Sequence, residues 1–235
     1  FRSSLGVNAT YDWKRVKLRS NIQYVGTDRL EDSRTTVDNY IRKDKSITRS
    51  TNNSRTENNN LVANAFLEWK MDSVTTLIFR PQYRFSANDR ENKGFQEGWG
   101  NDVLLNEKVS SGSSHNSQYN VTMMLQLSRK LSQKGRNVAL KVDYGTNSSS
   151  NDRKNLSTTH YFKNDREDSK NQKIEDDING YNYRVQLVYV EPLLWMHHLQ
   201  LRYSYQYKVN NSDRFVYDWN EDLGEFTPEI GRAHV

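Results

Sequence analysis

The sequence predicts an all-β protein: an antiparallel up-and-down transmembrane β-barrel, here an open curved sheet of about eight strands (a partial barrel) with long loops on one side. Three observations predict this fold. Apolar and polar residues alternate with a period of two in repeated stretches of about ten residues, as in strands. Short and long polar connections alternate along the chain. Aromatic residues gather at both ends of the apolar rows.

The alternation is clearest from Tyr181 to Tyr207, where two predicted strands flank a tight turn. The residues expected to share the apolar face are Tyr181, Tyr183, Val185, Leu187 and Tyr189 before the turn, and Leu199, Leu201, Tyr203, Tyr205 and Tyr207 after it. Pro192 lacks a backbone donor and therefore suits the turn better than the strand ladder.

Six earlier stretches repeat this unit. They cover residues 4–12, 16–24, 61–69, 77–85, 119–127 and 138–144. The middles of their apolar rows are mostly Val, Leu, Ala, Ile, Phe and Met. Pro81 falls within the fourth stretch, where proline cannot donate to the ladder, so we expect a bulge or an interrupted pair there.

The connections between these stretches are alternately short and long. The long ones are Gly26–Asn60, Asn88–Asn116 and Gly145–Gly180, and a fourth polar interval follows Tyr207. Outer-membrane barrels have short periplasmic turns and long external loops, so the three long intervals are predicted to be ligand-capturing loops outside the cell. Weak alternation within Gly26–Asn60 also allows a hairpin that projects beyond the main sheet.

The aromatic residues predict two belts at the membrane interfaces. The belt at the long-loop ends comprises Tyr24, Tyr83, Phe85, Tyr119, Tyr144, Tyr181, Tyr183, Tyr205 and Tyr207. The belt at the short-turn ends comprises Tyr11, Trp13, Trp69, Tyr189 and Trp195. A general preference of aromatics for strands explains their presence but not their sorting to the ends.

The composition disfavours an ordinary apolar core, because only 34% of the residues are hydrophobic and the mean hydropathy is -0.99. Disorder is the simple reading of such an average, but 14 Tyr, 8 Phe and 5 Trp argue against it. There is no Cys and therefore no disulfide framework. Residues 1–230 are read as one partial barrel domain and 231–235 as a non-native tail. The N-terminus resembles no signal peptide, so we expect the chain to begin inside a longer protein.

The polar face of the predicted strands is rich in basic residues. If this face lines a lumen, its basic candidates are Lys17, Arg19, Arg80, Arg84, Lys141, Arg184, Arg202 and Lys208. They could attract an anionic ligand or an acidic plug surface, although a solvated or plug-paired lumen explains them as well. The formal charge of +5 is dispersed among nearly as many acids, so no nucleic-acid partner is expected.

Metal-binding and catalytic motifs are weak or absent. The neighbouring His197 and His198 would point to opposite faces of a strand and could not easily share an ion. Asp176–Gly180 and Asp218–Asp222 resemble fragments of calcium loops but lack the distal glutamate in register. No phosphate loop, nucleophile elbow or metal-binding helix motif occurs. We therefore expect no metal, no cofactor and no enzymatic activity.

Two motifs in the last third of the chain resemble one family. Tyr189-Val-Glu-Pro-Leu193 followed by Leu199-Gln-Leu-Arg-Tyr-Ser-Tyr205 is similar to a turn and strand of the outer-membrane β-barrel family of Bacteroidetes-type bacteria, which resembles TonB-dependent receptors. Val216–Phe226 resembles a loop hairpin of that family. The resemblance implies a barrel of about 22 strands with an N-terminal plug in the Gram-negative outer membrane.

The resemblance further implies TonB-dependent uptake of an extracellular ligand, with the lipid bilayer, a plug domain and the TonB complex as partners. This sequence contains no recognisable plug or TonB box, so a fragment of the barrel wall is expected. Two alternatives stay open: a non-transporting outer-membrane barrel with an adhesive or structural role, and a soluble secreted glycan-binding β-protein.

Overall fold

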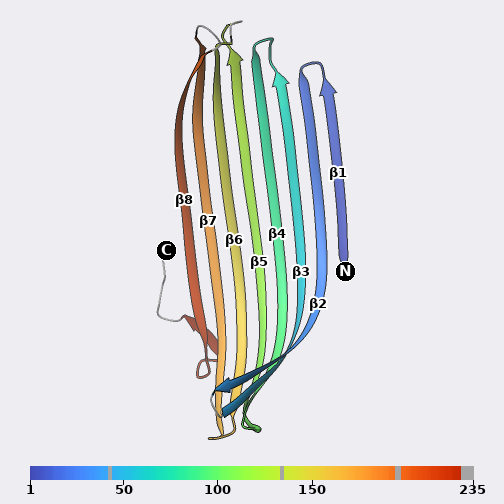
Figure 1. Cartoon of the computed structure of the whole chain (residues 1–235), viewed down its shortest axis with the longest axis vertical. Coiled ribbons are helices and arrows are strands. Elements are labelled where there is room, and N and C mark those ends of the chain that lie inside the picture. Colours follow the sequence, from blue (N-terminus) through green and yellow to red (C-terminus); the bar gives the residue numbers. More distant parts are fainter. Residues whose placement is uncertain (42–43, 133–134, 194–196, 229–235) are drawn as a thin grey trace.

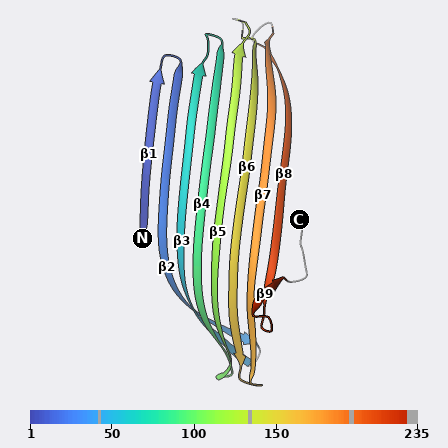
Figure 2. The same ribbon diagram turned by 180° about the vertical axis from the view of Figure 1, so that it is seen from behind.

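A computed structural model describes residues 1–41, 44–132, 135–193 and 197–228. These residues form one antiparallel sheet in which each strand pairs with the next along the chain (Figures 1 and 2). The strands are β1 (Arg2–Trp13), β2 (Val16–Ile41), β3 (Asp44–Lys70), β4 (Thr75–Gly100), β5 (Val103–Lys130), β6 (Asn137–Tyr161), β7 (Arg166–Pro192), β8 (His198–Asn220) and β9 (Glu225–Pro228). The predicted all-β, up-and-down, open sheet is confirmed.

The described part of the sheet has nine strands rather than about eight. The additional strand, β9, forms a short hairpin with β8 in which Asn220 pairs with Glu225. Gly224 adopts a φ of 66° in this turn, a conformation that glycine accepts without the steric penalty of a side chain. The hairpin overlaps Val216–Phe226, the segment that resembles a loop hairpin, and continues to Pro228.

The predicted long loops are wrong as loops. Gly26–Asn60, Asn88–Asn116 and Gly145–Gly180 are instead paired strands almost throughout. Antiparallel pairing needs only backbone donors and acceptors, so a hairpin that is wet on both faces can lack the apolar alternation by which a strand is recognised. The alternative of a projecting hairpin, which the sequence left open for Gly26–Asn60, is the arrangement found.

Within the described residues, tight turns occur at both ends of the sheet. Asn101 and Asp102 join β4 to β5 with φ values of 49° and 66°, which match the positive φ at both central residues of a type I′ hairpin turn. The Asp72 carboxylate accepts hydrogen bonds from the backbone N–H groups of Val74 at 2.8 Å and Thr75 at 2.6 Å, and so closes the β3–β4 turn. Gly135, between β5 and β6, has a φ of 100°, in the region that favours glycine.

Pro81 interrupts the ladder as the sequence predicted. Pairing of β3 with β4 passes from Asn64↔Gln82 to Leu67↔Phe79 without the two intervening pairs, and the register on both sides is the same. The missing donor of Pro81 thus costs local pairing but introduces no bulge. The register shift in this strand lies elsewhere, between Gly98 and Trp99 against β5.

The sheet has almost no interior of its own. Ile174 is the one buried hydrophobic residue among those described, whereas large apolar side chains such as Tyr203 and Leu187 are 69% and 45% exposed. The described residues contain no helix able to cross a membrane. The outer edge of β1 carries no strand, and β8 carries β9 only beside Tyr217–Asn220 in the described chain. Stability therefore requires something outside this sheet to cover its apolar surface.

The sheet is sheared rather than rectangular. A reference row of directly opposed residues runs through Trp13, Val16, Trp69, Leu77, Leu127, Leu140, Leu187 and Tyr203. On β1 the row passes through the last residue of the strand, Trp13, next to the β1–β2 turn. On β7 it passes through Leu187, five residues before the end of the strand at Pro192. The short-turn ends step in the same sense in Figure 1.

This step corresponds to a strand tilt. Five residues span about 16 Å, and the six strand spacings between the β1–β2 and β7–β8 turns span about 29 Å. The short-turn edge therefore slopes by roughly 30° against the pairing rows, close to the 35–45° at which barrel strands tilt. The far edge slopes the same way, because the reference row lies 25 residues from Ile41 but only 17 from Asn220.

Candidate membrane-facing surface and polar face

The predicted apolar residues all lie on one face of the sheet, termed here the apolar face. Their rows are directly opposed from strand to strand, for example Leu18↔Leu67, Leu67↔Phe79 and Phe79↔Leu125. Because side chains alternate between faces along a strand, a single one-residue slip would have moved a whole row to the other face. No such slip occurs between β1 and β8 within these rows.

The apolar residues form a band of limited height. On β2 it runs from Val16 to Tyr24, after which Gly26 and Asp28 occupy the same face. Nine residues span about 30 Å along the strand, or about 26 Å in height at a tilt of 30°. The apolar belt of outer-membrane barrels is about 25 Å tall. The band therefore has the height that a bilayer crossing needs.

The aromatic edge of this band nearest the long hairpins follows the shear of the sheet. On β2, β4 and β5 it is marked by Tyr24, Phe85 and Tyr119, which lie on one pairing row. On β6 and β8 it is marked by Tyr144 and Tyr207, whose row continues through Tyr183 on β7 to Met123 on β5, and on β7 the outermost aromatic residue is Tyr181. Compared with the row of Tyr119, the row of Tyr144 and Tyr207 lies four residues nearer the short turns and Tyr181 lies two residues nearer, so the edge steps toward the short turns, as both ends of the sheet do.

The structure places the predicted belt residues as follows. Most are exposed, including Trp13 at 60% and Tyr11 at 57%, whereas Phe85, Tyr183 and Tyr189 are half-buried. The Tyr183 ring packs beside those of Tyr205 and Tyr207, with centroid distances of 6.1 and 5.5 Å. Trp195 lies outside the described residues, as does the predicted tail 231–235. The belts are thus accessible surface, available to an apolar solvent.

All eight predicted basic residues lie on the opposite, polar face. Three of them have partners there: Lys141 forms an ion pair with Asp143 at 3.1 Å, Arg184 donates two hydrogen bonds to Gln206, and Arg80 stacks over the Phe66 ring at 5.0 Å. The other five are Lys17, Arg19, Arg84, Arg202 and Lys208. Whether this face encloses a lumen stays a prediction, because the sheet is open.

A polar row that sequence reasoning missed crosses the polar face beyond the band. It consists of Thr27, Asn58, Asn88, Asn116, Asn151, Asp176 and Arg214, each directly opposite the next. Asn58 donates to Thr27 at 3.2 Å, Asn88 donates to Asn58, and Asp176 also pairs with Arg153. These residues lay in intervals predicted as loops, so only the register could have brought them together.

The long paired hairpins beyond the band are termed here the extension. On their apolar-face side the side chains are mostly charged or polar. Arg55 pairs with both Asp28 at 2.9 Å and Glu57 at 2.7 Å. The hydrogen bonds from the Arg55 guanidinium lower the pKa of the Asp28 carboxyl. These exposed ion pairs contribute little to stability, and they identify the extension as a surface suited to water.

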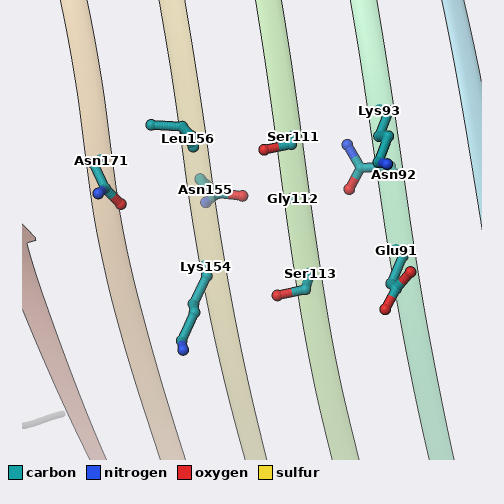
Figure 3. A pocket seen from close by; sticks show the side chains of 10 residues that line it. All are labelled: Glu91, Asn92, Lys93, Ser111, Gly112, Ser113, Lys154, Asn155, Leu156 and Asn171. Atoms are coloured by element: carbon teal, nitrogen blue, oxygen red, sulfur yellow. The ribbon is translucent and has the colours of Figure 1, made fainter.

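A shallow depression of about 300 Å³ lies on the extension (Figure 3). Its floor follows β5, where Ser111 and Ser113 are small, and Lys93 and Lys154 flank it on β4 and β6. Glu91 also lines it, so its charges are mixed. Among the described residues no group of three His, Asp or Glu side chains could hold a metal ion.

Comparison with known proteins does not assign this chain to a family. No family model and no curated protein matches it. Its fold has faint likeness to the closed form of the ferric-catecholate import receptor Fiu of Escherichia coli K12 (8% identity, TM-score 0.19), covering 92% of this chain but only 46% of the receptor. The transport unit of the Escherichia coli autotransporter AIDA-I has 9% identity and a TM-score of 0.12 over 88% and 87% of the two chains. At these TM-scores neither likeness carries an argument about function.

Proposed function

We propose that this chain is part of the wall of an outer-membrane β-barrel, with its apolar face in lipid and its polar face toward a lumen. The observation that supports this most is the sloping aromatic edge, which steps with the shear of the sheet. A tilted sheet in a bilayer must keep its interface residues at one height, so its aromatic rows must cross the pairing rows obliquely. A sheet covered by a protein partner has no such requirement.

The extension lies outside the cell in this proposal, and the β1–β2, β3–β4, β5–β6 and β7–β8 connections lie on the periplasmic side. The assignment follows the rule that barrels have short periplasmic turns and longer external segments. Strand β2 continues from the band to Ile41, roughly 55 Å along the strand beyond Tyr24, and its far end bends across the neighbouring strands (Figure 1).

Cysteine labelling of intact cells tests this topology, and the sequence has no cysteine of its own. We expect a membrane-impermeant maleimide to label Ser33→Cys in the extension of intact cells. The matched variant Ser73→Cys, in the β3–β4 turn, should react only after the outer membrane is permeabilised. Labelling of both variants in intact cells, or of neither, would contradict the proposed orientation.

For the barrel as a whole we propose TonB-dependent uptake of a ligand captured outside the cell. Support comes from the motifs at Tyr189–Leu193 and Leu199–Tyr205 and from the basic polar face. Transport requires a plug domain and the energising inner-membrane complex. Uptake should therefore stop when that complex is removed, and Arg80→Gln with Arg184→Gln should slow the uptake of an anionic ligand. Uptake that persists without the complex would exclude this mechanism.

A second candidate, an adhesive or structural barrel, is favoured by the extension itself. The β2–β3, β4–β5 and β6–β7 hairpins are paired almost to their tips, which makes them stiff projections rather than mobile capture loops. Trimming the β4–β5 hairpin beyond Asn88 and Asn116 separates the two roles. In an adhesin, the trimmed protein would lose its attachment to surfaces, and neither form would take up ligand. In a transporter, the trimming would change the rate of ligand uptake.

A further inference from the structure

A second depression, of about 330 Å³, lies on the polar face at the height of the outer aromatic edge. Three adjacent strands supply its polar lining: Arg84 and Ser86 from β4, Gln118 and Asn120 from β5, and Asn147 and Ser149 from β6. Register makes this set compact, because Arg84 is directly opposite Asn120 and Asn120 is directly opposite Asn147. The volume is at the lower end of the range for small-molecule pockets.

The polar groups in this depression are unused by the protein. Within the described chain, Arg84, Gln118 and Asn120 take part in no side-chain hydrogen bond or ion pair. Neighbouring positions differ: Thr122 donates to Gln82, and Thr146 donates to the backbone carbonyl of Gly180 at 3.0 Å. A guanidinium, three carboxamides and two hydroxyls therefore converge with their donors and acceptors free for a ligand.

No carboxylate competes for the Arg84 guanidinium. The three polar-face rows through Gln82, Arg84 and Ser86 contain only neutral side chains besides Arg84 and Lys208 in the described strands. The nearest acids on this face already have partners: Asp143 is paired with Lys141, and Asp176 with Arg153. The local field at the depression is therefore positive.

Glycine on β7 leaves room for this arrangement. Gly180 is directly opposite Asn147, and a Cβ at position 180 would lie 3.0 Å from the Asn147 carboxamide oxygen. A side chain at position 180 would push Asn147 toward the depression.

We propose that this depression binds a small hydroxylated carboxylate. The inference rests on the proposed function, since it places the ligand on the lumen side of the wall. Arg84 would hold the carboxylate through two parallel N–H···O bonds, the geometry for which a guanidinium is suited. The amides of Gln118, Asn120 and Asn147 would donate to and accept from the hydroxyl groups.

Gluconate and sorbitol test this inference, since they carry similar hydroxyls and differ in the carboxylate. Titration calorimetry of the complete protein in detergent should show gluconate binding at least about tenfold more tightly than sorbitol. Arg84→Gln should remove this preference. The control Arg90→Gln makes the same charge change on the same strand and face, outside the depression, and should keep it.

Equal affinity for the two probes, or equal losses in Arg84→Gln and Arg90→Gln, would overturn the site. A second measurement distinguishes a failure of the proposed site from a failure of the proposed membrane wall. It monitors membrane insertion of the same preparations through quenching of tryptophan fluorescence by lipid. Protein that inserts without preferring gluconate overturns the site alone. Protein that does not insert overturns the wall and the site together.

Discussion

At the scale of single residues, Asp72 shows how one carboxylate helps to fix the ends of two long strands. Its Oδ1 atom accepts both the Val74 and the Thr75 N–H groups in the turn before β4. These backbone hydrogen bonds, the Val74 one first, lower the pKa of the carboxyl. The charged form is thus favoured in the folded hairpin, and register in β3–β4 depends on this turn.

Asp72→Ala should lower the urea midpoint for unfolding of the detergent-solubilised protein more than Asp72→Asn, because asparagine keeps an acceptor oxygen. The folded-state pKa is below the unfolded one, so the ionic contribution is present above about pH 4 and is lost as the pH falls through the lowered pKa. The gap between wild type and Asp72→Asn should therefore close at acid pH. A gap that is independent of pH between 3 and 7 would contradict this role.

At the scale of strands, the apolar stretches were predictable and the extension was not. Val16–Tyr24 and Leu61–Trp69 carry a period-two pattern because one face is apolar, and the structure pairs them in the register that the pattern requires. Residues 26–60 carry mostly polar side chains on both faces, so their strands leave only a weak periodic signal. The Asn row and the depression beside Arg84 depend on cross-strand neighbours, which no single stretch of sequence displays.

A charge placed within the band should be far more costly than the same charge in the extension. Leu125 and Val109 lie on the same strand and the same face, the first within the band, opposite Phe79 and Val142, and the second beyond it. Leu125→Arg should destabilise the membrane-inserted protein by about 2–4 kcal/mol, the cost of arginine near the bilayer midplane. Val109→Arg should change the stability little. Similar costs measured by urea titration in lipid vesicles would argue against a bilayer at this height.

At the scale of the whole molecule, the sheet is open. Both large faces are exposed, and the outer edges of β1 and most of β8 carry no further strand in the described chain. Lipid cannot satisfy the backbone groups of an open edge, so a membrane-spanning sheet must close into a barrel. In our proposal, further strands pair with β1 and β8 and complete the wall.

The isolated 235-residue chain should therefore not fold stably in plain buffer. It has almost no buried apolar surface to offset the conformational entropy of ordering nine strands. We expect aggregation or unfolding by circular dichroism and sedimentation, without a cooperative transition. Reversible two-state unfolding of a soluble monomer would show that the sheet is stable without a bilayer or closure, against our account.

Depth-dependent quenching of single tryptophans tests the central claim, that the apolar face lies in lipid, most directly. Trp69 and Trp219 are similarly exposed, at 41% and 40%, but Trp69 lies at the edge of the band and Trp219 lies in the extension. In vesicles of brominated phospholipid, with every other tryptophan replaced by phenylalanine, Trp69 should be strongly quenched and Trp219 should not. Equal quenching of the two, or an unquenched Trp69, would contradict the account.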